Sequence, residues 1–469
     1  MITNISTFDN GISLLDSKNI VPYTANNHYQ SASDKILTFL ACLWIVAASL
    51  GPDSTFLGII KIRPEDIITI IMSIIVIFKM HGHKVNFYSF QLTFKIILFS
   101  ISLCIISILS AYIHSLSQEI ITYVEGAGTF GYPKNLEIMK EIIRFVKYIL
   151  VAFAFSQVSE GSWKYVLNSI IISCFIMIGI QLFQFIMPDV INLTIKEIFV
   201  EGNVADNEDI LIYSGESARE TREFRTGSIM INPNVFGAYL IAPLFIVTMK
   251  YFEYLNSPFL KDRKNRLVWL SISCITILGL FLTQSRTMLI SIVLAMITTL
   301  MFVPHTFRRK ISRFIIVVII ISTIFTVIFS DFTYRYSLDG LEKGLMQESF
   351  NKKVDWTLDA INSLGYLIVI GTGPAGAAFV DNEFGLILLW YGLIGYLMYL
   401  IFYYSLYAHV SRRIKNIYQR AAFRGILIAY LIGSVGASFF FNNRVFPVFI
   451  ALLSLACAKS VQMPRRTHR

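Results

Sequence analysis

The amino-acid sequence predicts an all-α, polytopic membrane protein with about twelve transmembrane helices. Composition is the first reason, because 55% of the 469 residues are hydrophobic, 15% are charged and the mean hydropathy is +0.63. The second reason is a series of apolar runs long enough to cross the hydrocarbon core of a bilayer, which is about 30 Å thick. The third is that many charged residues lie in the segments between those runs. Soluble and disordered chains do not combine these features.

The expected helices follow the apolar runs in order. Residues 1–35 are mostly polar and lack the apolar core of a signal peptide, so we expect the first run to be a retained helix. The twelve predicted helices are residues 36–51, 64–80, 92–113, 142–158, 164–187, 234–254, 267–283, 286–303, 312–330, 383–406, 421–440 and 446–461. The second and the last are short for a membrane crossing, which leaves the number open by about one or two.

Basic residues orient these helices. Segments rich in Lys and Arg recur at residues 261–266, 308–313, 412–420 and 465–466, and alternation places them on one side of the membrane. An excess of Lys and Arg is typical of cytoplasmic loops. This placement accounts for the formal net charge of +10 without nucleic acid as a partner. The five cysteines are scattered through apolar runs and show neither disulfide nor metal-binding spacing.

The opposite, extracytoplasmic side then receives two large loops, and long loops in compact proteins usually have a role. Both chain termini are cytoplasmic in this arrangement. The predicted organisation is a cytoplasmic segment 1–35, N-terminal membrane helices 36–187, an outer loop 188–233, central membrane helices 234–330, a larger outer loop 331–382, C-terminal membrane helices 383–461 and a basic cytoplasmic tail 462–469.

A polar break at residues 282–287 separates two of the apolar runs and carries Arg286. The break is too short for a loop domain, so we expect Arg286 at the outer face of the membrane. Arginine costs about 2.5 to 3.5 kcal/mol at the centre of a membrane helix on insertion scales, whereas long basic side chains near helix ends reach the interface. The position fits either an anion-binding role or simple snorkelling of the side chain.

The first large outer loop ends in Arg225, followed shortly by Asn232-Pro233-Asn234. Asparagine before proline is a good N-cap with proline at the first helical position, which explains the motif structurally. The same helix start also presents backbone amides and a positive dipole end to an anion near Arg225. Both interpretations stay open.

The second large outer loop ends in two further motifs. The segment Gly371-Thr-Gly-Pro-Ala-Gly376 formally matches a dinucleotide-binding pattern, but it has no βαβ unit around it and predicts a tight or flexible turn instead. The segment Asp381-Asn382-Glu383 places carboxylates at the start of the next helix. There they either favour the helix dipole or act in catalysis.

In their order along the chain, these residues resemble a known family. The O-antigen ligase and O-antigen polymerase superfamily of bacterial envelope enzymes has motifs similar to Arg225-x-Gly227, Asn232-Pro-Asn234, Ser285-Arg286, Trp356, Gly371-x-Gly373, Asp381-Asn382 and Tyr391-Gly-Leu-Ile-Gly395. The resemblance spans residues 225–400, whereas the preceding part of the chain is similar only in its helix pattern.

The resemblance implies a glycosyltransferase of the bacterial inner membrane, with a multi-helix architecture like that of the GT-C class and an active site facing the periplasm or cell exterior. It implies a glycan donor linked through pyrophosphate to undecaprenol, and transfer with inversion and without a metal ion or other cofactor. Arginines at the Arg225 and Arg286 positions would engage the pyrophosphate. Guanidinium groups suit that role, because their bidentate hydrogen bonds neutralise the charge that develops on the leaving group.

Two departures from the family pattern matter. The ligases carry a histidine before the asparagine that is Asn382 here, and this chain has Asp381, whose carboxylate can accept a proton from an acceptor hydroxyl. That difference favours the polymerase branch. Lys353, near Trp356, stands where arginine is expected and lacks the bidentate fork. The predicted catalytic residues are Asp381, Arg286 and Arg225, and the predicted substrate-binding residues are Arg225, Arg286, Asn232, Asn234, Ser285, Lys353, Trp356 and Asn382.

The resulting hypothesis is a polymerase that joins oligosaccharide repeat units, carried on undecaprenyl pyrophosphate, into O-antigen, capsule or exopolysaccharide chains. The expected partners are this lipid-linked oligosaccharide, membrane lipid, a chain-length regulator and a flippase. An O-antigen ligase is the alternative within the family. A lipid-linked oligosaccharide flippase is the alternative of another class, although no internal repeat is visible and the polar residues gather at helix ends. A non-catalytic chain-length scaffold is a third alternative.

Overall fold

The computed structural model describes residues 32–51, 54–56, 60–81, 90–117, 123–124, 128–129, 135–187, 226–230, 232–255, 263–301, 365–374 and 382–461, with a few isolated positions between 308 and 362. The regular structure of these residues is helical, apart from two short antiparallel hairpins. One hairpin pairs β1 (Ser54–Phe56) with β2 (Ile60–Ile62), and the other pairs β3 (Tyr123–Val124) with β4 (Gly128–Thr129). The predicted helical fold class is confirmed for the described part of the chain.

The helices occupy the predicted apolar runs. Their bounds are α1 (Ala32–Leu50), α2 (Pro64–His81), α3 (Gln91–Ser117), α4 (Asn135–Ser156), α5 (Trp163–Ile186), α9 (Pro233–Leu255), α10 (Arg263–Leu282), α11 (Arg286–Met301), α15 (Glu383–Arg413), α16 (Ile417–Gly433) and α17 (Val445–Val461). Short 3-10 helices are η2 (Glu160–Ser162), η3 (Ser228–Met230) and η6 (Gly365–Val369). The helix predicted over 312–330 lies almost entirely outside the described residues.

Six of the described helices are long and apolar enough to cross a membrane, namely α1, α3, α5, α9, α10 and α15, and shorter apolar stretches lie in α11 and α17. Helix α3 shows how such a helix meets lipid. Phe94, Leu98 and Ile101 are exposed at helical spacing, whereas Ile96 and Phe99 on the other face are buried. Apolar side chains on both faces suit a helix with protein on one side and lipid on the other. The architecture is that of a polytopic membrane protein, and the number of spans stays a prediction.

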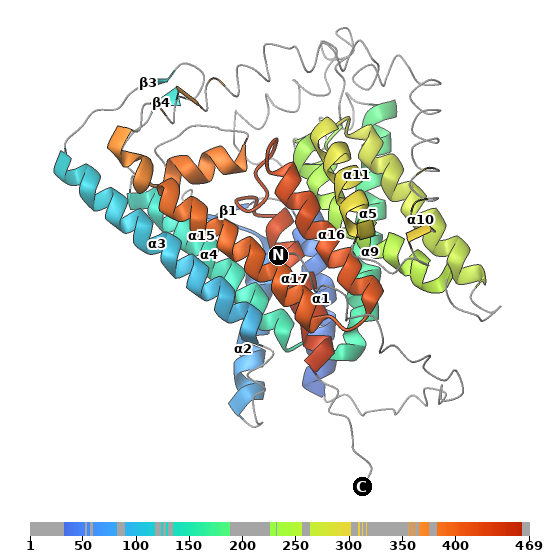
Figure 1. Ribbon diagram of the computed structural model, residues 1–469. Helices are drawn as coiled ribbons and strands as arrows, with labels where there is room; N and C mark the ends of the chain where they lie inside the picture. The colour runs from blue at the N-terminus through green and yellow to red at the C-terminus, as the bar shows by residue number, and fades with distance from the viewer. Residues whose placement is uncertain are drawn as a thin grey trace, which may run out of the picture.

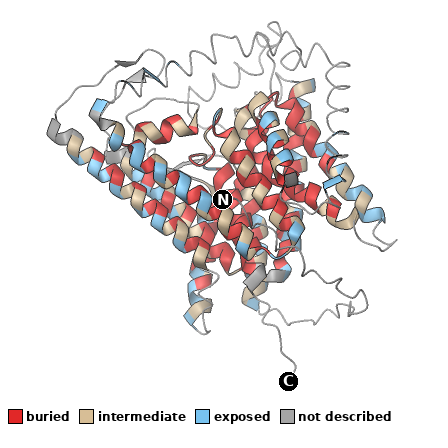
Figure 2. Ribbon diagram, in the orientation of Figure 1, coloured by how far each residue is buried: buried red, intermediate tan, exposed pale blue. Residues whose placement is uncertain are grey.

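Helix α9 lies at the centre of the described helices. It packs against α5, α10, α11, α16 and α17, and its residues from Phe236 to Met249 are buried, as the red ribbon in Figure 2 shows. Around this centre α1 packs against α2 and α5, α17 against α4, and α15 against α3 (Figure 1). An apolar surface on all sides of α9 explains its central place.

Helix α16 ends earlier than the sequence predicts. The helix expected over 421–440 stops at Gly433, and residues 434–444 form a connection to α17. The apolar run does continue through Phe439 and Phe440, which are buried. Their backbone N–H groups, however, donate to the carboxylate of Glu383 instead of to helical carbonyl groups. A tertiary contact therefore replaces the last predicted turns of the helix.

Helix α15 is broken at Gly392, which has φ 63° and ψ −168°. The turn that contains Gly371 lies against this break, and its N–H groups at Thr372 and Gly373 donate to the carbonyl oxygens of Leu389 and Trp390 at 2.8 and 2.9 Å. Carbonyl groups freed by the break thus regain donors, as buried backbone requires. The described residues of the predicted turn, 371–374, pair with this break. Helix α15 occupies the helix predicted over 383–406, with a kink at Gly392 that the sequence analysis did not predict.

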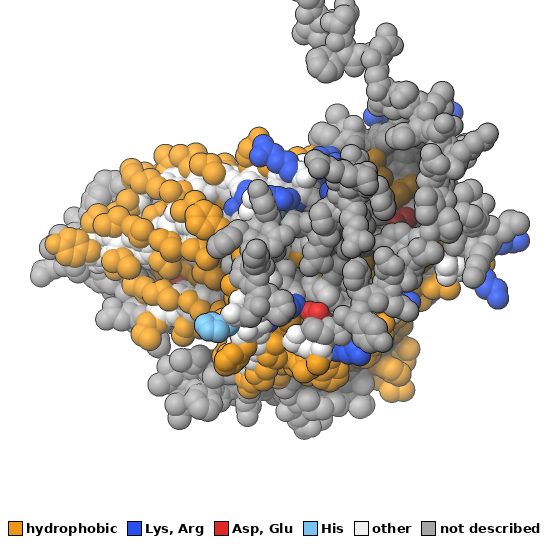
Figure 3. Space-filling view, turned by 90° about the horizontal axis from the view of Figure 1, so that it is seen from below, with side chains coloured by type: hydrophobic (Ala, Val, Ile, Leu, Met, Phe, Trp, Pro, Cys, Tyr) orange, Lys and Arg blue, Asp and Glu red, His pale blue; other side chains and the backbone are white. Residues whose placement is uncertain are grey.

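Exposed basic side chains mark one end of the helices. Exposed basic side chains, among them Arg263, Lys264, Arg412 and Lys415, lie where α10 and α16 begin and α15 finishes. Figure 3 shows the molecule from below, with Lys and Arg side chains set among apolar ones. Helices α9, α11, α15 and α17 begin at the opposite end. We call that opposite end the site end, because the described site residues lie there.

Candidate functional site

Helix α9 begins with the predicted cap. The side-chain oxygen of Asn232 accepts a hydrogen bond from the N–H of Asn234 at 2.9 Å, and its carbonyl oxygen accepts one from Phe236 at 3.1 Å. Pro233 occupies the first helical position, where its missing N–H costs nothing. The predicted N-cap is confirmed, and the positive end of the α9 dipole lies at the site end.

The turn between α10 and α11 meets this cap directly. Ser285 Oγ donates to Asn234 Oδ1 at 2.8 Å, and the serine carbonyl accepts the N–H of Leu289 at 3.1 Å, so Ser285 also begins α11. The turn is tight because Gln284 adopts φ 49°, which is uncommon for a residue other than glycine. A Cβ on Gly237 would lie 2.9 Å from the Met288 side chain, so glycine permits this close approach of α9 and α11.

Arg286 is the first residue of α11 and is half-buried. The residue interacts with other groups of the protein. A cation at the N-terminus of a helix is disfavoured by the helix dipole, whereas an anion there is favoured. The placement therefore suits a negative ligand that would meet the guanidinium group and the helix start together.

The segment that follows Arg225 is anchored to the same turn. Thr226 Oγ1 donates to the carbonyl oxygen of Leu282 at 2.9 Å, and Gln181 of α5 donates to the Thr226 carbonyl at 3.3 Å. Gln184 accepts the N–H of Ser228 at 2.8 Å. The sequence analysis missed both glutamines. The sequence did offer a sign of their role. The two glutamines are three positions apart in a largely apolar helix, which places both side chains on one face.

Asn382 caps α15. Its side-chain oxygen accepts the N–H groups of Phe384 and Gly385 at 3.0 and 3.4 Å. This geometry is that of an N-cap, and it leaves the side-chain amide nitrogen for other contacts. Asp381, the preceding residue, lies outside the described residues.

Glu383 is 0% exposed and accepts four hydrogen bonds. The donors are the hydroxyl groups of Tyr399 at 2.6 Å and Ser434 at 3.2 Å, and the N–H groups of Phe439 at 2.5 Å and Phe440 at 3.1 Å. A buried carboxylate is tolerated when its oxygen atoms are so fully bonded. Glu383 therefore fastens α15 to the α16–α17 connection, a role that the sequence did not reveal.

The start of α15 and the start of α11 belong to one packed unit. The N–H of Glu383 donates to the Ser434 carbonyl oxygen at 2.9 Å, at the end of α16. Two residues after Ser434, a Cβ on Gly436 would lie 2.6 Å from the Thr287 side chain, so the α16–α17 connection and the first turn of α11 are in close contact. The structure thus brings Asn382 and Arg286 to the same end of the same packed helices.

Of the predicted site residues, the structure brings together Asn232, Asn234, Ser285, Arg286 and Asn382 at the site end. Arg225, Lys353, Trp356 and Asp381 lie outside the described residues.

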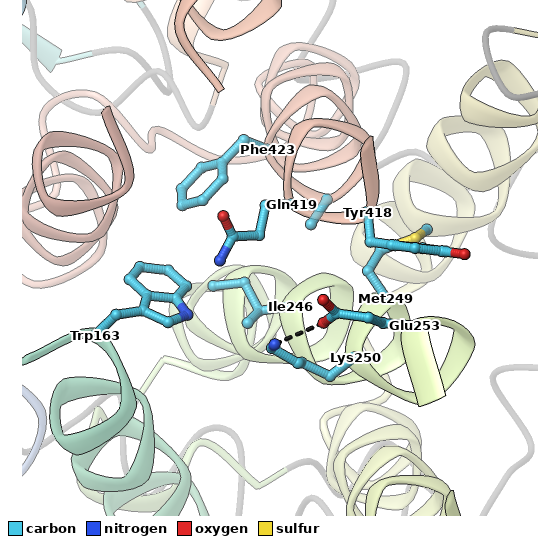
Figure 4. A pocket seen from close by; sticks show the side chains of 9 residues that line it. Trp163, Ile246, Met249, Lys250, Glu253, Tyr418, Gln419 and Phe423 are labelled. Carbon is cyan, nitrogen blue, oxygen red and sulfur yellow. Dashed lines mark hydrogen bonds and ion pairs between the residues drawn. The ribbon is translucent and has the colours of Figure 1, made fainter. Parts of the chain in front are cut away.

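A small pocket lies at the opposite end of α9. Figure 4 shows its lining side chains from α5, α9 and α16, among them Trp163, Gln419 and the Lys250–Glu253 ion pair. With a rise of about 1.5 Å per residue, Lys250 lies roughly 24 Å along α9 from Asn234. The cavity measures about 10 Å³, roughly the room of one water molecule. It is therefore separate from the site end and too small for a sugar.

No protein-family model matches the chain, and no curated protein matches it in sequence. The family resemblance rests on the order of the motifs and on their positions.

Proposed function

We propose that this chain is an integral-membrane polysaccharide polymerase. It transfers an oligosaccharide from undecaprenyl pyrophosphate to a hydroxyl group of another repeat unit. The observation that carries this proposal is the convergence of Asn234, Ser285, Arg286 and Asn382, from three separate helix starts, at one end of the packed helices. Helix starts and an arginine together favour a phosphate-bearing ligand.

The charge distribution supports an orientation for the site. Exposed basic side chains gather at the end opposite the site end, which is typical of the cytoplasmic face. In a bacterial inner membrane the site end then faces the periplasm or the cell exterior. The isoprenoid tail of the donor lies in the bilayer beside the helices, and its pyrophosphate lies at the level of Arg286.

The proposed reaction is a single displacement. The acceptor hydroxyl oxygen forms the new bond to the anomeric carbon of the donor, while the bond from that carbon to the pyrophosphate oxygen breaks. Asp381, next to the Asn382 cap, takes the hydroxyl proton. Arg225 and Arg286 stabilise the negative charge on the departing pyrophosphate. Ser285 and Asn234 hold the α11 start in place, and Lys353 and Trp356 complete the substrate contacts by analogy with the family.

A flippase is the second candidate, and the break in α15 is the observation that favours it, because discontinuous helices mark the sites of many transporters. Two carbonyl groups at this break, however, are occupied by N–H groups of the Gly371–Gly373 turn. Each of them already accepts one hydrogen bond, which weakens it as a ligand for a coupling ion, so the polymerase is the stronger proposal. A ligase would use the same site with a different acceptor.

The deciding experiment compares the surface and lipid-linked polysaccharide of cells that lack this chain with cells that carry it back. A lost polymerase leaves single repeat units and no ladder. Full-length polymer trapped on the isoprenoid carrier points to a ligase, and repeat units confined to the cytoplasmic leaflet point to a flippase.

The variant Asp381→Asn, compared with the wild type at equal protein level, tests the proposed proton transfer. The polymerase proposal expects membranes with this variant to bind donor and to form polymer at a strongly reduced rate. An unchanged rate contradicts the proposed base.

A further inference from the structure

Helices α3 and α15 meet in a seam that carries basic side chains at the end opposite the site end. The two helices pack against each other and run side by side (Figure 1). None of the seam residues belongs to the motifs that predicted the proposed active site. We call this place the α3–α15 seam, and it consists of Phe94, Lys95, Leu98, Ile401, Ser405 and Arg412.

Lys95 is half-buried in the second turn of α3 and joins the two helices. Its Nζ donates to the carbonyl oxygen of Ser405 at 3.1 Å and to the hydroxyl oxygen of the same residue at 2.6 Å. An ammonium group has three N–H donors, so one remains for a ligand after these two bonds. Because both acceptors are neutral, they hold the ammonium group in place without neutralising its charge.

Arg412 brings a second cation to Lys95. The residue is exposed in the last turn of α15, and its positive charge acts on Lys95. Ser405 and Arg412 are seven positions apart, which is two helical turns, so they lie on the same face of α15. Two like charges brought together in this way disfavour each other, and an anion between them would remove that repulsion.

No carboxylate of α3, of α15 or of the chain next to them compensates these cations. Residues 67–118 and 384–469 contain neither Asp nor Glu. In the part of the chain that the structure describes, Lys95 and Arg412 form no ion pair. The neighbouring Arg413 donates to Gln91 of α3 and has further contacts, so it is not counted as a free charge. Lys95 and Arg412 alone give the seam two positive charges, which suit an anion.

Apolar side chains continue the seam away from the two cations. On α3, Phe94 and Leu98 are 64% and 59% exposed, and on α15 Ile401 is 66% exposed. Ile401 precedes Arg412 by eleven positions, or three helical turns, so an exposed apolar face of α15 ends at this arginine. Such faces of a membrane protein meet acyl chains. The seam therefore suits a ligand with an anionic head and apolar tails.

We propose that the α3–α15 seam binds one anionic glycerophospholipid from the bilayer leaflet at this end of the helices. The lipid phosphate accepts hydrogen bonds from Lys95 and Arg412, and the acyl chains lie along Phe94, Leu98 and Ile401. Basic pockets between membrane helices are known to bind such headgroups. A zwitterionic phospholipid suits the seam less well, because its ammonium group would meet the same two cations. The inference is independent of the polymerase proposal.

Snorkelling of basic side chains to the interface is the alternative explanation. It accounts for an exposed Arg412 at a helix end. It does not account for Lys95, because the ammonium group of this residue is turned onto Ser405 of the neighbouring helix instead of into water. The two cations are therefore arranged around one place and not dispersed into solvent.

The test uses native mass spectrometry to count the lipids that the purified full-length chain retains. The chain in detergent is mixed with equal amounts of phosphatidylglycerol and phosphatidylethanolamine that have the same acyl chains. We expect the wild type to retain one phosphatidylglycerol in preference to phosphatidylethanolamine. Arg412→Gln should lower this preference about fivefold, the contribution of one basic residue near an anionic membrane surface. Arg412→Lys keeps the charge and should keep most of the preference.

Lys264→Gln is the matched control, because it removes an exposed cation at the same end of the molecule but on α10. It should leave the lipid preference unchanged. Since Arg412 is exposed, Arg412→Gln should also leave the unfolding temperature without lipid unchanged, which separates lipid binding from a structural role.

The proposal is overturned if the wild type retains both lipids equally, or if Arg412→Gln keeps the preference of the wild type. It is equally overturned if Lys264→Gln lowers the preference as much as Arg412→Gln, because the attraction would then be general to this end of the molecule. Displacement of the lipid by inorganic phosphate, but not by chloride at equal ionic strength, would show a site for a soluble anion and would also overturn it.

Discussion

Ser285 and Asn234 are 51 positions apart in the chain, and the serine hydroxyl donates to the asparagine side chain at 2.8 Å. One hydrogen bond thus joins the first turn of α9 to the residue that precedes α11. Both residues are at helix starts that present N–H groups to the same end of the molecule. The position of Arg286, the residue after Ser285, therefore depends on the start of α9 as well as on its own helix.

The Ser285–Asn234 bond is expected to couple the two helix starts. Ser285→Ala and Asn234→Ala should each lower the free energy of unfolding by about 1 kcal/mol. The double variant should lower it by less than the sum of the two single effects. Thermal unfolding of the purified wild type, the two single variants and the double variant in detergent measures these differences. Ser102→Ala is the control, since that hydroxyl bonds within its own helix. Strict additivity of the two substitutions would show that the bond does not couple the helices.

Arg286 is expected to act through its planar fork and not through charge alone. Arg286→Lys and Arg286→Ala should both lower the rate of polymer formation, by about a hundredfold for alanine, because an electrostatic contact to the leaving group is lost. Lys264→Ala removes an exposed cation at the opposite end and should change nothing. The measurement is the rate of ladder formation in membranes with matched protein levels. Normal polymer from Arg286→Ala would remove this residue from the mechanism.

Glu383 is expected to stabilise the fold. Glu383→Ala leaves the N–H groups of Phe439 and Phe440 buried without an acceptor, which should cost about 2 to 4 kcal/mol. Glu383→Gln keeps one acceptor oxygen and should cost less. Glu253→Ala, at a partly exposed ion pair, should cost less than about 1 kcal/mol. Unfolding temperatures and the yield of monodisperse protein rank the three variants by loss of stability. Equal losses for Glu383→Ala and Glu253→Ala would contradict the role of Glu383.

Gly392 is expected to tolerate no side chain. It has φ 63°, and a Cβ there would lie 2.4 Å from the Val369 carbonyl oxygen. Gly392→Ala should therefore destabilise the chain by at least about 1 to 3 kcal/mol. Gly179 is the matched control, because a Cβ at that helical position meets nothing within 4 Å. Gly179→Ala should be neutral or stabilise by up to about 1 kcal/mol. Similar unfolding temperatures for the two variants would show that the backbone around Gly392 can shift to accept a side chain.

Much of the fold was predictable, since an apolar run long enough to cross a bilayer has few alternatives to a helix. The Asn232 cap and the short turn before Arg286 were predictable for a similar reason, as cap and turn residues act on their immediate neighbours. The end of α16 was not. Phe439 and Phe440 continue an apolar pattern, and only the carboxylate of Glu383, more than fifty positions away, takes their N–H groups out of the helix.

The sequence by itself determined the helical class, the placement of the helices and the residue types suited to a pyrophosphate. These features depend on composition and on contacts between near neighbours. The tertiary structure alone decided that Ser285 meets Asn234, that Glu383 is a buried anchor and that Arg144 reaches Asn443. Such contacts join residues far apart in the chain, and their geometry is fixed only when the helices pack.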